Sequence, residues 1–191
     1  MQTMALRMRR KGIQVFIIAP LKGHEFYRAA RNVGGEFIQI SPASKNCINI
    51  MEIRKVDNSV NELLDGPTLD ASALAGKIQR LHIFFSLLIP DMSHEEKQLL
   101  DEALIKTYAR KGITHKNESL TDPQHPEQYK KMPILEDVYN VLLESEDTKR
   151  LAHILNRLVH GSASSFNQQT NVDLTNKYTV CLLYTSDAAD E

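Results

Sequence analysis

The spacing of apolar residues in the first forty positions predicts helices that alternate with strands. A short run of branched apolar residues, Gln14 to Ala19, is typical of a strand covered on both faces, and Glu36 to Ile40 alternates as a second strand. Helical spacing precedes the first strand and recurs between the two, at Met1, Met4, Ala5 and Met8 and then at Phe26, Ala29, Ala30 and Val33. This alternation predicts an α/β fold built on a parallel sheet.

From residue 58 onward the pattern predicts helices only. The first of them carries one apolar stripe: Leu74, Ile78, Leu81, Phe85 and Leu88. Ser93 and Glu96 have the spacing of a capping box, which predicts the start of a second helix that ends before Gly112. A polar connection over 113–132 leads to two more helices, one from Pro133 and one that stops at Gly161. We therefore divide the chain into an α/β part at 1–57, a helical part at 58–160 and a return to the α/β part at 161–180.

The two ends of the chain suggest that it is a piece of a longer protein. Cys181 to Glu191 match, residue for residue, the translation of the end of a common transposon-based sequencing adapter. We therefore expect natural sequence to end near Val180, inside a strand, and leave the last eleven residues out of fold reasoning. The first predicted helix has no capping residue before Met1, so we expect its beginning to be missing as well.

Composition narrows the possible functions only a little. The 23 basic residues nearly balance the 24 acidic ones, so no overall field favours a polyanion or an anionic membrane, and any nucleic-acid contact would have to be local. Without the tail, Cys47 is the only cysteine, which excludes an internal disulfide and favours a reducing compartment. The longest apolar run, Ile83 to Ile89, is too short to span a membrane, which takes about 20 residues.

Two blocks of sequence carry a resemblance to a known family. The block GGEFIQISPASKNCINIMEI at 34–53 resembles a strand followed by S-P-x-S-x-x-x-I-N-x-M-x-I, and FNQQTNVDL at 166–174 resembles F-N-x-x-T-N-V-D. In both blocks the chain is similar to the VirB-type ATPases of type IV secretion and conjugation, the TraC/TraE-like group in the HerA/FtsK branch of P-loop ATPases. The resemblance runs from Met1 to about Val180. It implies a partial RecA-like sheet of parallel strands with an all-α insertion.

The resemblance also implies a function for the parent protein. Such a protein hydrolyses ATP with Mg²⁺, as a hexamer in the cytoplasm at the inner face of the bacterial cell membrane, to power DNA or protein transfer. Its partners would be components of the secretion channel and, indirectly, DNA bound to a relaxase. The G-x-x-x-x-G-K-[ST] phosphate loop would precede Met1 and the acidic Mg²⁺ motif would follow Val180, so we expect this fragment to bind nucleotide poorly and to be inactive.

Two other functional classes were weighed against this one. The alternative is a non-enzymatic helical adaptor that shares an α/β edge with the ATPases. A DNA-binding module is disfavoured because the sequence shows neither a basic stripe nor stacking aromatic residues.

Candidate site residues follow the first strand. Ligands of doubly wound sheets bind at the carboxyl ends of strands, so we expect Lys22, His24 and Glu25 near the nucleotide edge. The resemblance implies that Glu25 orients or deprotonates the attacking water, although Ala19 stands where the wider branch carries an aspartate. The alternative for Glu25 is a favourable position in the first turn of a helix, and the alternative for Lys22 is a solvated side chain.

A second candidate group lies in the loop before the last strand. Short polar side chains cluster there, at Asn167, Thr170, Asn171 and Asp173. They could line the nucleotide site, where we place Asn171, or they could hold a tight turn through bonds to the backbone. We predict no metal site: His82 lies in an apolar helix without a second ligand at i+4, which favours a hydrogen-bonded core or boundary histidine.

Overall fold

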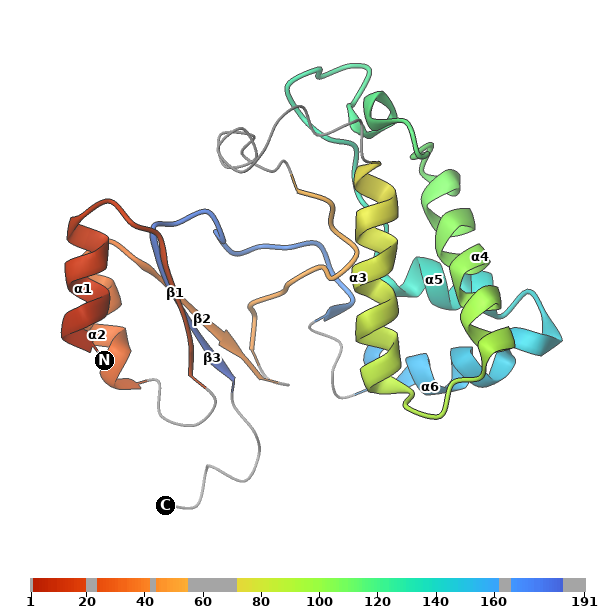
Figure 1. The fold of residues 1–191 in the computed structure, drawn as a ribbon, viewed down its shortest axis with the longest axis horizontal. Coiled ribbons are helices and arrows are strands. Elements are labelled where there is room, and N and C mark those ends of the chain that lie inside the picture. Colours follow the sequence, from red (N-terminus) through yellow and green to blue (C-terminus); the bar gives the residue numbers. More distant parts are fainter. Residues whose placement is uncertain (1, 20–23, 42–43, 55–71, 162–165, 184–191) are drawn as a thin grey trace. The chain divides into compact units, whose positions relative to one another are not determined.

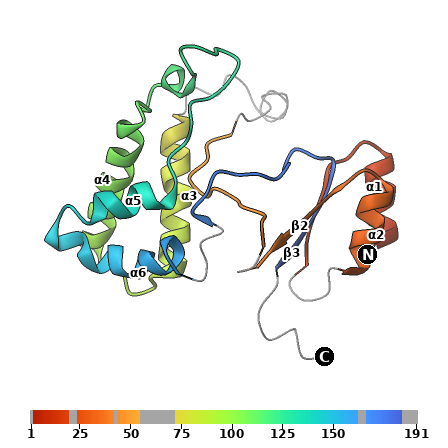
Figure 2. The same cartoon turned by 180° about the vertical axis from the view of Figure 1, so that it is seen from behind.

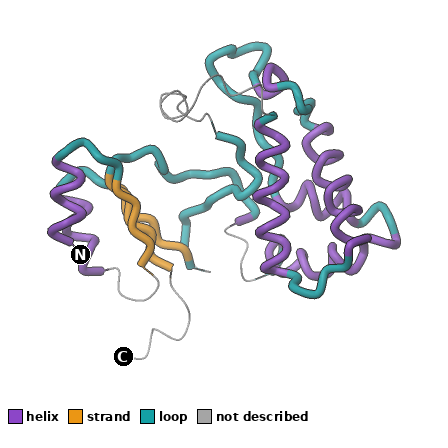
Figure 3. The backbone as a smooth tube through the Cα atoms, in the orientation of Figure 1, coloured by secondary structure: helices purple, strands orange, loops and turns teal. Residues whose placement is uncertain are grey.

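The chain folds into two compact units in a computed structural model that describes residues 2–19, 24–41, 44–54, 72–161 and 166–183. One unit, the sheet unit, combines residues 1–48 with residues 162–191, and the other, the helical unit, spans residues 49–161. Figure 3 shows the strands in the sheet unit and only helices, loops and turns along the described part of the helical unit. The sequence placed the change to helices at residue 58, which lies outside the described residues.

Three parallel strands form the sheet: β1 (Val15–Ala19), β2 (Glu36–Ile40) and β3 (Tyr178–Leu183). Their order is β1-β3-β2, so the strand from the far end of the chain lies between the two early ones (Figure 1). Val15 pairs with Tyr178 and Glu36 pairs with Thr179 at the start of the ladders. The α/β class with a parallel sheet, predicted from the alternation of helices and strands, is confirmed.

The strand β3 extends past the point where the sequence reasoning stopped. Cys181 pairs with both Ile18 and Ile38, and Leu182 pairs with Ala19 and Gln39. Cys181 and Leu182 are buried. Leaving these residues out of fold reasoning was therefore wrong for 181–183, because an apolar Cys-Leu-Leu run satisfies a central strand whatever its origin.

Two helices, α1 (Gln2–Arg10) and α2 (His24–Asn32), cover one face of the sheet (Figure 1, Figure 2). Their inner sides and the strands beneath them form one apolar core: Ala5, Val15, Phe26, Ala30, Tyr178 and Val180. Met4 was expected to share this core, but 62% of it is exposed and the half-buried Leu6 packs inward instead. After α2 the chain passes so close to β3 that a Cβ on Gly35 would lie 2.5 Å from the Tyr178 carbonyl oxygen, which only glycine allows.

Four α-helices build the helical unit: α3 (Ala73–Leu88), α4 (His94–Arg110), α5 (Leu135–Leu142) and α6 (Lys149–Val159). The predicted stripe of α3 is buried at Leu74, Ile78, Leu81 and Phe85. The predicted capping box of α4 is confirmed, since Ser93 Oγ accepts from the Glu96 N–H at 3.1 Å and Glu96 Oε2 accepts from the Ser93 N–H at 2.9 Å. The helix expected from Pro133 begins two residues later, after a cap in which Asp137 accepts from the Ile134 N–H.

The connection over 113–132 is more ordered than its polar sequence suggested. It contains the short 3-10 helix η1 (Asn117–Leu120) and an antiparallel bridge between Thr121 and Tyr129. Ile113 and Leu120 are buried, so the connection contributes to the core of the helical unit. A second 3-10 helix, η2 (Glu146–Thr148), precedes α6.

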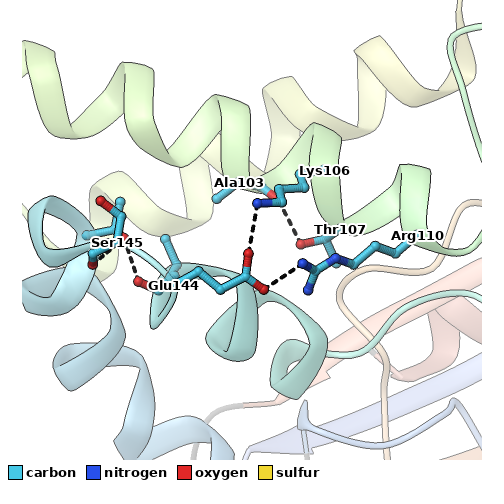
Figure 4. A network of polar contacts seen from close by, with 8 residues as sticks. Ala103, Lys106, Thr107, Arg110, Glu144 and Ser145 are labelled. Carbon is cyan, nitrogen blue, oxygen red and sulfur yellow. Dashed lines mark hydrogen bonds and ion pairs between the residues drawn. The ribbon is translucent and has the colours of Figure 1, made fainter.

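Polar contacts join α4 to the end of α5 (Figure 4). Lys106 Nζ donates to one oxygen of Glu144 at 2.8 Å, and the Arg110 guanidinium donates to the other at 2.5 Å. These two bonds hold the pKa of the Glu144 carboxyl below its usual value. Because the three side chains are exposed, we expect these contacts to add little to the stability of the unit.

Candidate functional site

Glu25 lies in the first turn of α2, on the segment that leaves the carboxyl end of β1. Its side chain is exposed, and its backbone carbonyl accepts a hydrogen bond of 3.1 Å from Gln2 Nε2. This position agrees with both interpretations of Glu25, a carboxylate open to a ligand and a favourable charge at a helix N-terminus. His24 begins the same helix. Lys22 lies outside the described residues.

Asn171 holds together the two segments that carry the family resemblance. Its side-chain amide donates to the Lys45 carbonyl at 2.7 Å and its side-chain oxygen accepts from the Cys47 N–H at 2.7 Å. Its own N–H donates to the Cys47 carbonyl at 3.2 Å. One residue therefore makes three hydrogen bonds to the segment after β2. Its side-chain amide donates one bond and accepts another, as a backbone peptide group in a strand does.

The rest of this loop is organised by bonds to nearby groups. Asp173 accepts from the hydroxyl and the N–H of Thr175, and the hydroxyl above all holds the pKa of the carboxyl below its usual value. Asn176 accepts from the Tyr178 N–H at 2.9 Å and donates to the Gly34 carbonyl at 3.1 Å. These contacts are the turn-forming chemistry that the sequence left open as an alternative. The loop delivers the chain to the amino end of β3.

The candidate residues do not form one cluster. Glu25 follows the carboxyl end of β1, whereas Asn171 is engaged with the Lys45–Cys47 segment and leads to the amino end of β3. Among the bonds of the described residues, none joins Glu25 to Asn171. Sequence reasoning also passed over Gln168, whose side-chain oxygen lies 3.5 Å from the buried Cys47 thiol and closes the same junction. Its place beside Asn171 in the FNQQTN block was the only signal for it.

Lys77 on α3 is the cation with the most perturbed pKa in the described chain, and the sequence analysis did not single it out. Burial, followed by the nearby Arg80 and Arg54 charges, lowers the pKa of its ammonium group to about 8. Such a shift marks a functional candidate in a cleft, but it also arises where a helix carries a lysine against its own core. The nearby Glu52 carboxylate, which pairs with Arg54, opposes this shift and raises the pKa.

The predicted role of His82 is confirmed. His82 Nε2 lies 2.8 Å from Asp101 Oδ1, which joins α3 to α4 at a partly exposed boundary. Among the described residues, no group of three histidine, cysteine or acidic side chains could hold a metal ion. In the same residues, no helix has the length and apolar character needed to cross a membrane.

Comparison with known proteins gives one detailed likeness. No protein-family model and no curated protein matches the chain. Chains of solved structures do match, among them VirB4 of Thermoanaerobacter pseudethanolicus, with a TM-score of 0.75 and 26% sequence identity over 99% of this chain. The match covers 46% of the VirB4 chain, so this chain spans less than half of that protein. The likeness agrees with the expected fold class, a partial RecA-like sheet of parallel strands with an all-α insertion.

Proposed function

We propose that this chain is a segment of a type IV secretion ATPase of the VirB type, from the HerA/FtsK branch of P-loop ATPases. The observation that carries the proposal is the match to VirB4, which extends over 99% of the chain at 26% identity. The two sequence blocks that suggested the family are also joined directly, through the three bonds of Asn171. In this proposal residues 58–160 are the helical insertion of the ATPase and the sheet unit is part of its core.

The parent protein would hydrolyse ATP with Mg²⁺ as a hexamer and power conjugative transfer of DNA or protein. Its place would be the cytoplasmic face of the inner membrane, beside the secretion channel. The present chain does not fit a Mg²⁺–ATP site by itself. It has no Gly-x-x-x-x-Gly-Lys loop, and its described residues offer no cluster of metal ligands. Residues outside this chain would have to supply both, and we derive no chemical step for the chain alone.

Glu25 is the residue of this chain that we assign to catalysis in the parent. It stands on the segment after a parallel strand, at the edge where sheets of this kind bind their ligands, and its carboxylate is exposed. A carboxylate in that position can hold or accept a proton from a water molecule. Lys22 and His24, which precede Glu25 in the sequence, are proposed to lie near the nucleotide, whereas the bonds of Asn171 to Lys45 and Cys47 favour the backbone-bonding alternative for that residue.

The decisive experiment compares the complete gene product with the 191-residue chain. The complete protein should contain the phosphate loop N-terminal to Met1 and hydrolyse ATP, and the chain alone should show no turnover above background. In the complete protein, Glu25→Gln should lower kcat at least about 100-fold, as loss of a general base does. The matched change Glu95→Gln, at another exposed glutamate in the first turn of a helix, should leave kcat unchanged.

Two results would contradict the proposal. A complete gene product without a phosphate loop would favour the helical adaptor. ATP turnover by the 191-residue chain itself, abolished by Glu25→Gln, would show that the chain is an enzyme on its own.

A further inference from the structure

The two units differ sharply in charge, although the chain as a whole is nearly neutral. The described part of the sheet unit contains eight lysine and arginine residues but only three carboxylates. The described part of the helical unit has thirteen lysine and arginine residues and fourteen carboxylates. All nine ion pairs found among the described residues lie in the helical unit. The excess positive charge of the sheet unit is therefore not neutralised by ion pairs in the described chain.

Most of this charge lies on the helices α1 and α2 and on Lys11, the residue directly after α1. Five cationic side chains are exposed there and take part in none of the ion pairs above: Arg7, Arg10, Lys11, Arg28 and Arg31. We call these five residues the basic face. The single carboxylate on these two helices, Glu25, stands at the opposite end of α2 from Arg31.

The geometry of the two helices brings these charges to one place. Each helix leads into a strand of the same parallel sheet and covers the same face, so the helices run side by side in the same direction (Figure 1, Figure 2). The bond from Gln2 to the Glu25 carbonyl sets their relative height. At about 1.5 Å per residue, Arg7 lies about 7 Å beyond Gln2, between the heights of Arg28 and Arg31. Cations from both helices thus gather near their C-terminal ends.

One apolar side chain, Met4, stands among the cations, and Tyr27 lies beside them with its ring packed edge-on against Phe37 of β2, at 5.0 Å between the ring centroids. Met4 precedes Arg7 by one turn of α1 and is 62% exposed, and Tyr27 precedes Arg31 by one turn of α2 and is 43% exposed. The apolar sides of both helices pack in the core, so a membrane would be bound by the cations, which attract anionic headgroups, with an exposed apolar side chain entering the headgroup boundary. A nucleic acid would use the arginines and could stack on Tyr27, but it offers no apolar environment for Met4.

We propose that the basic face binds the surface of a membrane that contains anionic phospholipids. Arginine guanidinium groups would pair with lipid phosphates, while the exposed Met4 would enter the boundary between headgroups and acyl chains. The face would give a physical basis to the membrane location proposed for the parent protein. It lies on α1, α2 and Lys11 and involves no nucleotide, so its test can fail or succeed separately from the ATPase proposal.

The test measures sedimentation of the full 191-residue chain with vesicles. The chain should bind vesicles of 30% phosphatidylglycerol in phosphatidylcholine and should not bind pure phosphatidylcholine, and binding should fall steeply between low and high salt. Since each lysine or arginine near such a surface contributes about fivefold, Arg28→Gln with Arg31→Gln should lower the partition coefficient about 25-fold. Arg7→Gln with Arg10→Gln should do the same from the other helix.

The matched control is Lys116→Gln with Lys131→Gln, which removes two exposed cations from the helical unit and should change binding less than twofold. Circular dichroism establishes that each variant is folded. Equal binding to both kinds of vesicle, or no loss in either arginine variant, would overturn the proposal. The proposal would also be overturned if the chain bound a 20-base-pair DNA duplex more tightly than the vesicles at equal phosphate concentration, and if both arginine variants abolished that binding. The face would then recognise nucleic acid.

Discussion

At the scale of single residues, Asn171 alone makes three hydrogen bonds between two distant segments of the sheet unit. Its side-chain oxygen, its side-chain NH2 group and its backbone N–H all bind the Lys45–Cys47 segment. Asn171 and Cys47 are 124 residues apart in the sequence. Residues in two distant blocks are therefore matched to each other. The bonds therefore give a structural reason why the two blocks that resemble the family occur together, whether or not the loop also contacts a nucleotide.

We predict that Asn171→Ala destabilises the sheet unit by about 0.5–1.5 kcal/mol, because the side-chain bonds to the Cys47 N–H and the Lys45 carbonyl are lost at a position that water can reach. Hydrogen exchange measured by NMR should show faster exchange at the Cys47 amide. The control Asn140→Ala removes an exposed asparagine from α5 and should leave exchange in the sheet unit as it was. Unchanged exchange at Cys47 would mean that the Asn171 bonds do not hold this junction.

Lys77 illustrates a residue whose charge opposes folding. Burial and two neighbouring arginines lower its pKa to about 8, below the value near 10.4 of an unfolded lysine. Between these two values the unfolded state binds more protons than the folded state, so this residue makes stability rise with pH over that window. Below about pH 8 both states are protonated and the full cost of the buried charge is present.

We therefore predict that Lys77→Met raises the stability of the helical unit at pH 7 and flattens its rise between pH 8 and 10. Urea denaturation followed by circular dichroism across this range measures both effects. Lys97→Met, on α4, is the control for added hydrophobicity without relief of the same charges. A loss of stability at pH 7 would show that the Lys77 ammonium makes a favourable contact.

At the scale of elements, local chemistry sets where the helices of the helical unit begin. The Ser93 hydroxyl and the Glu96 carboxylate satisfy two N–H groups that α4 would otherwise leave without partners. Glu96 also accepts from Arg150 at 2.6 Å, which joins the start of α4 to α6. The Ser93 N–H, more than Arg150, holds the pKa of Glu96 below its usual value. Capping and packing here support the same arrangement.

We predict that Ser93→Ala destabilises the helical unit by about 1 kcal/mol, as loss of a capping hydroxyl does. Thermal unfolding followed at 222 nm would measure the change. Ser86→Ala is the matched control, since Ser86 is an exposed serine in the interior of α3 where alanine favours the helix. If both serine variants unfold alike, the capping box contributes nothing.

At the scale of the whole molecule, the sheet depends on both ends of the described chain. The strand β3 lies between β1 and β2, so each early strand has its only partner in the described sheet at residues 178–183. Tyr178, Val180 and Leu182 are buried with it. The sheet unit therefore cannot form from the first 48 residues alone.

We predict that a chain ending at Val180 loses the sheet unit while the helical unit stays folded. Hydrogen exchange should show protection lost from β1 and β2 and kept in α4 and α5. The control ends at Leu183 and should keep its sheet. A second variant, Cys181→Val in the full chain, should fold normally because any apolar, strand-forming residue suits this position. A folded sheet in the chain ending at Val180 would mean that the five strand pairs made by Cys181, Leu182 and Leu183 are dispensable.

Hydrophobic periodicity and capping chemistry were enough to predict the long helices and the early strands of this protein, but not the 3-10 helix and the bridge within 113–132 or the last residues of β3. The run from Gln14 to Ala19, the stripe of α3 and the Ser93 capping box are local patterns, and each gives its element in the structure. The expectation that the first strand is covered on both faces was wrong, since Phe16 and Ile18 of β1 are 49% and 62% exposed.

His82 was also correctly predicted as a hydrogen-bonded core or boundary histidine, and its partly exposed bond to Asp101 shows that it is the boundary one. The exposure of Met4 was missed, since a helical stripe alone does not say which apolar side chain meets the sheet.

The amino-acid sequence by itself determined the class of each segment, because apolar spacing, caps and glycines act within a few residues. Only the tertiary structure decided which segments meet. It placed β3 between β1 and β2, joined Asn171 to Cys47 and gathered arginines from α1 and α2 on one face. These contacts depend on distances through space between residues that are far apart along the chain. The near-zero net charge of the sequence and its polar loop do not reveal these contacts.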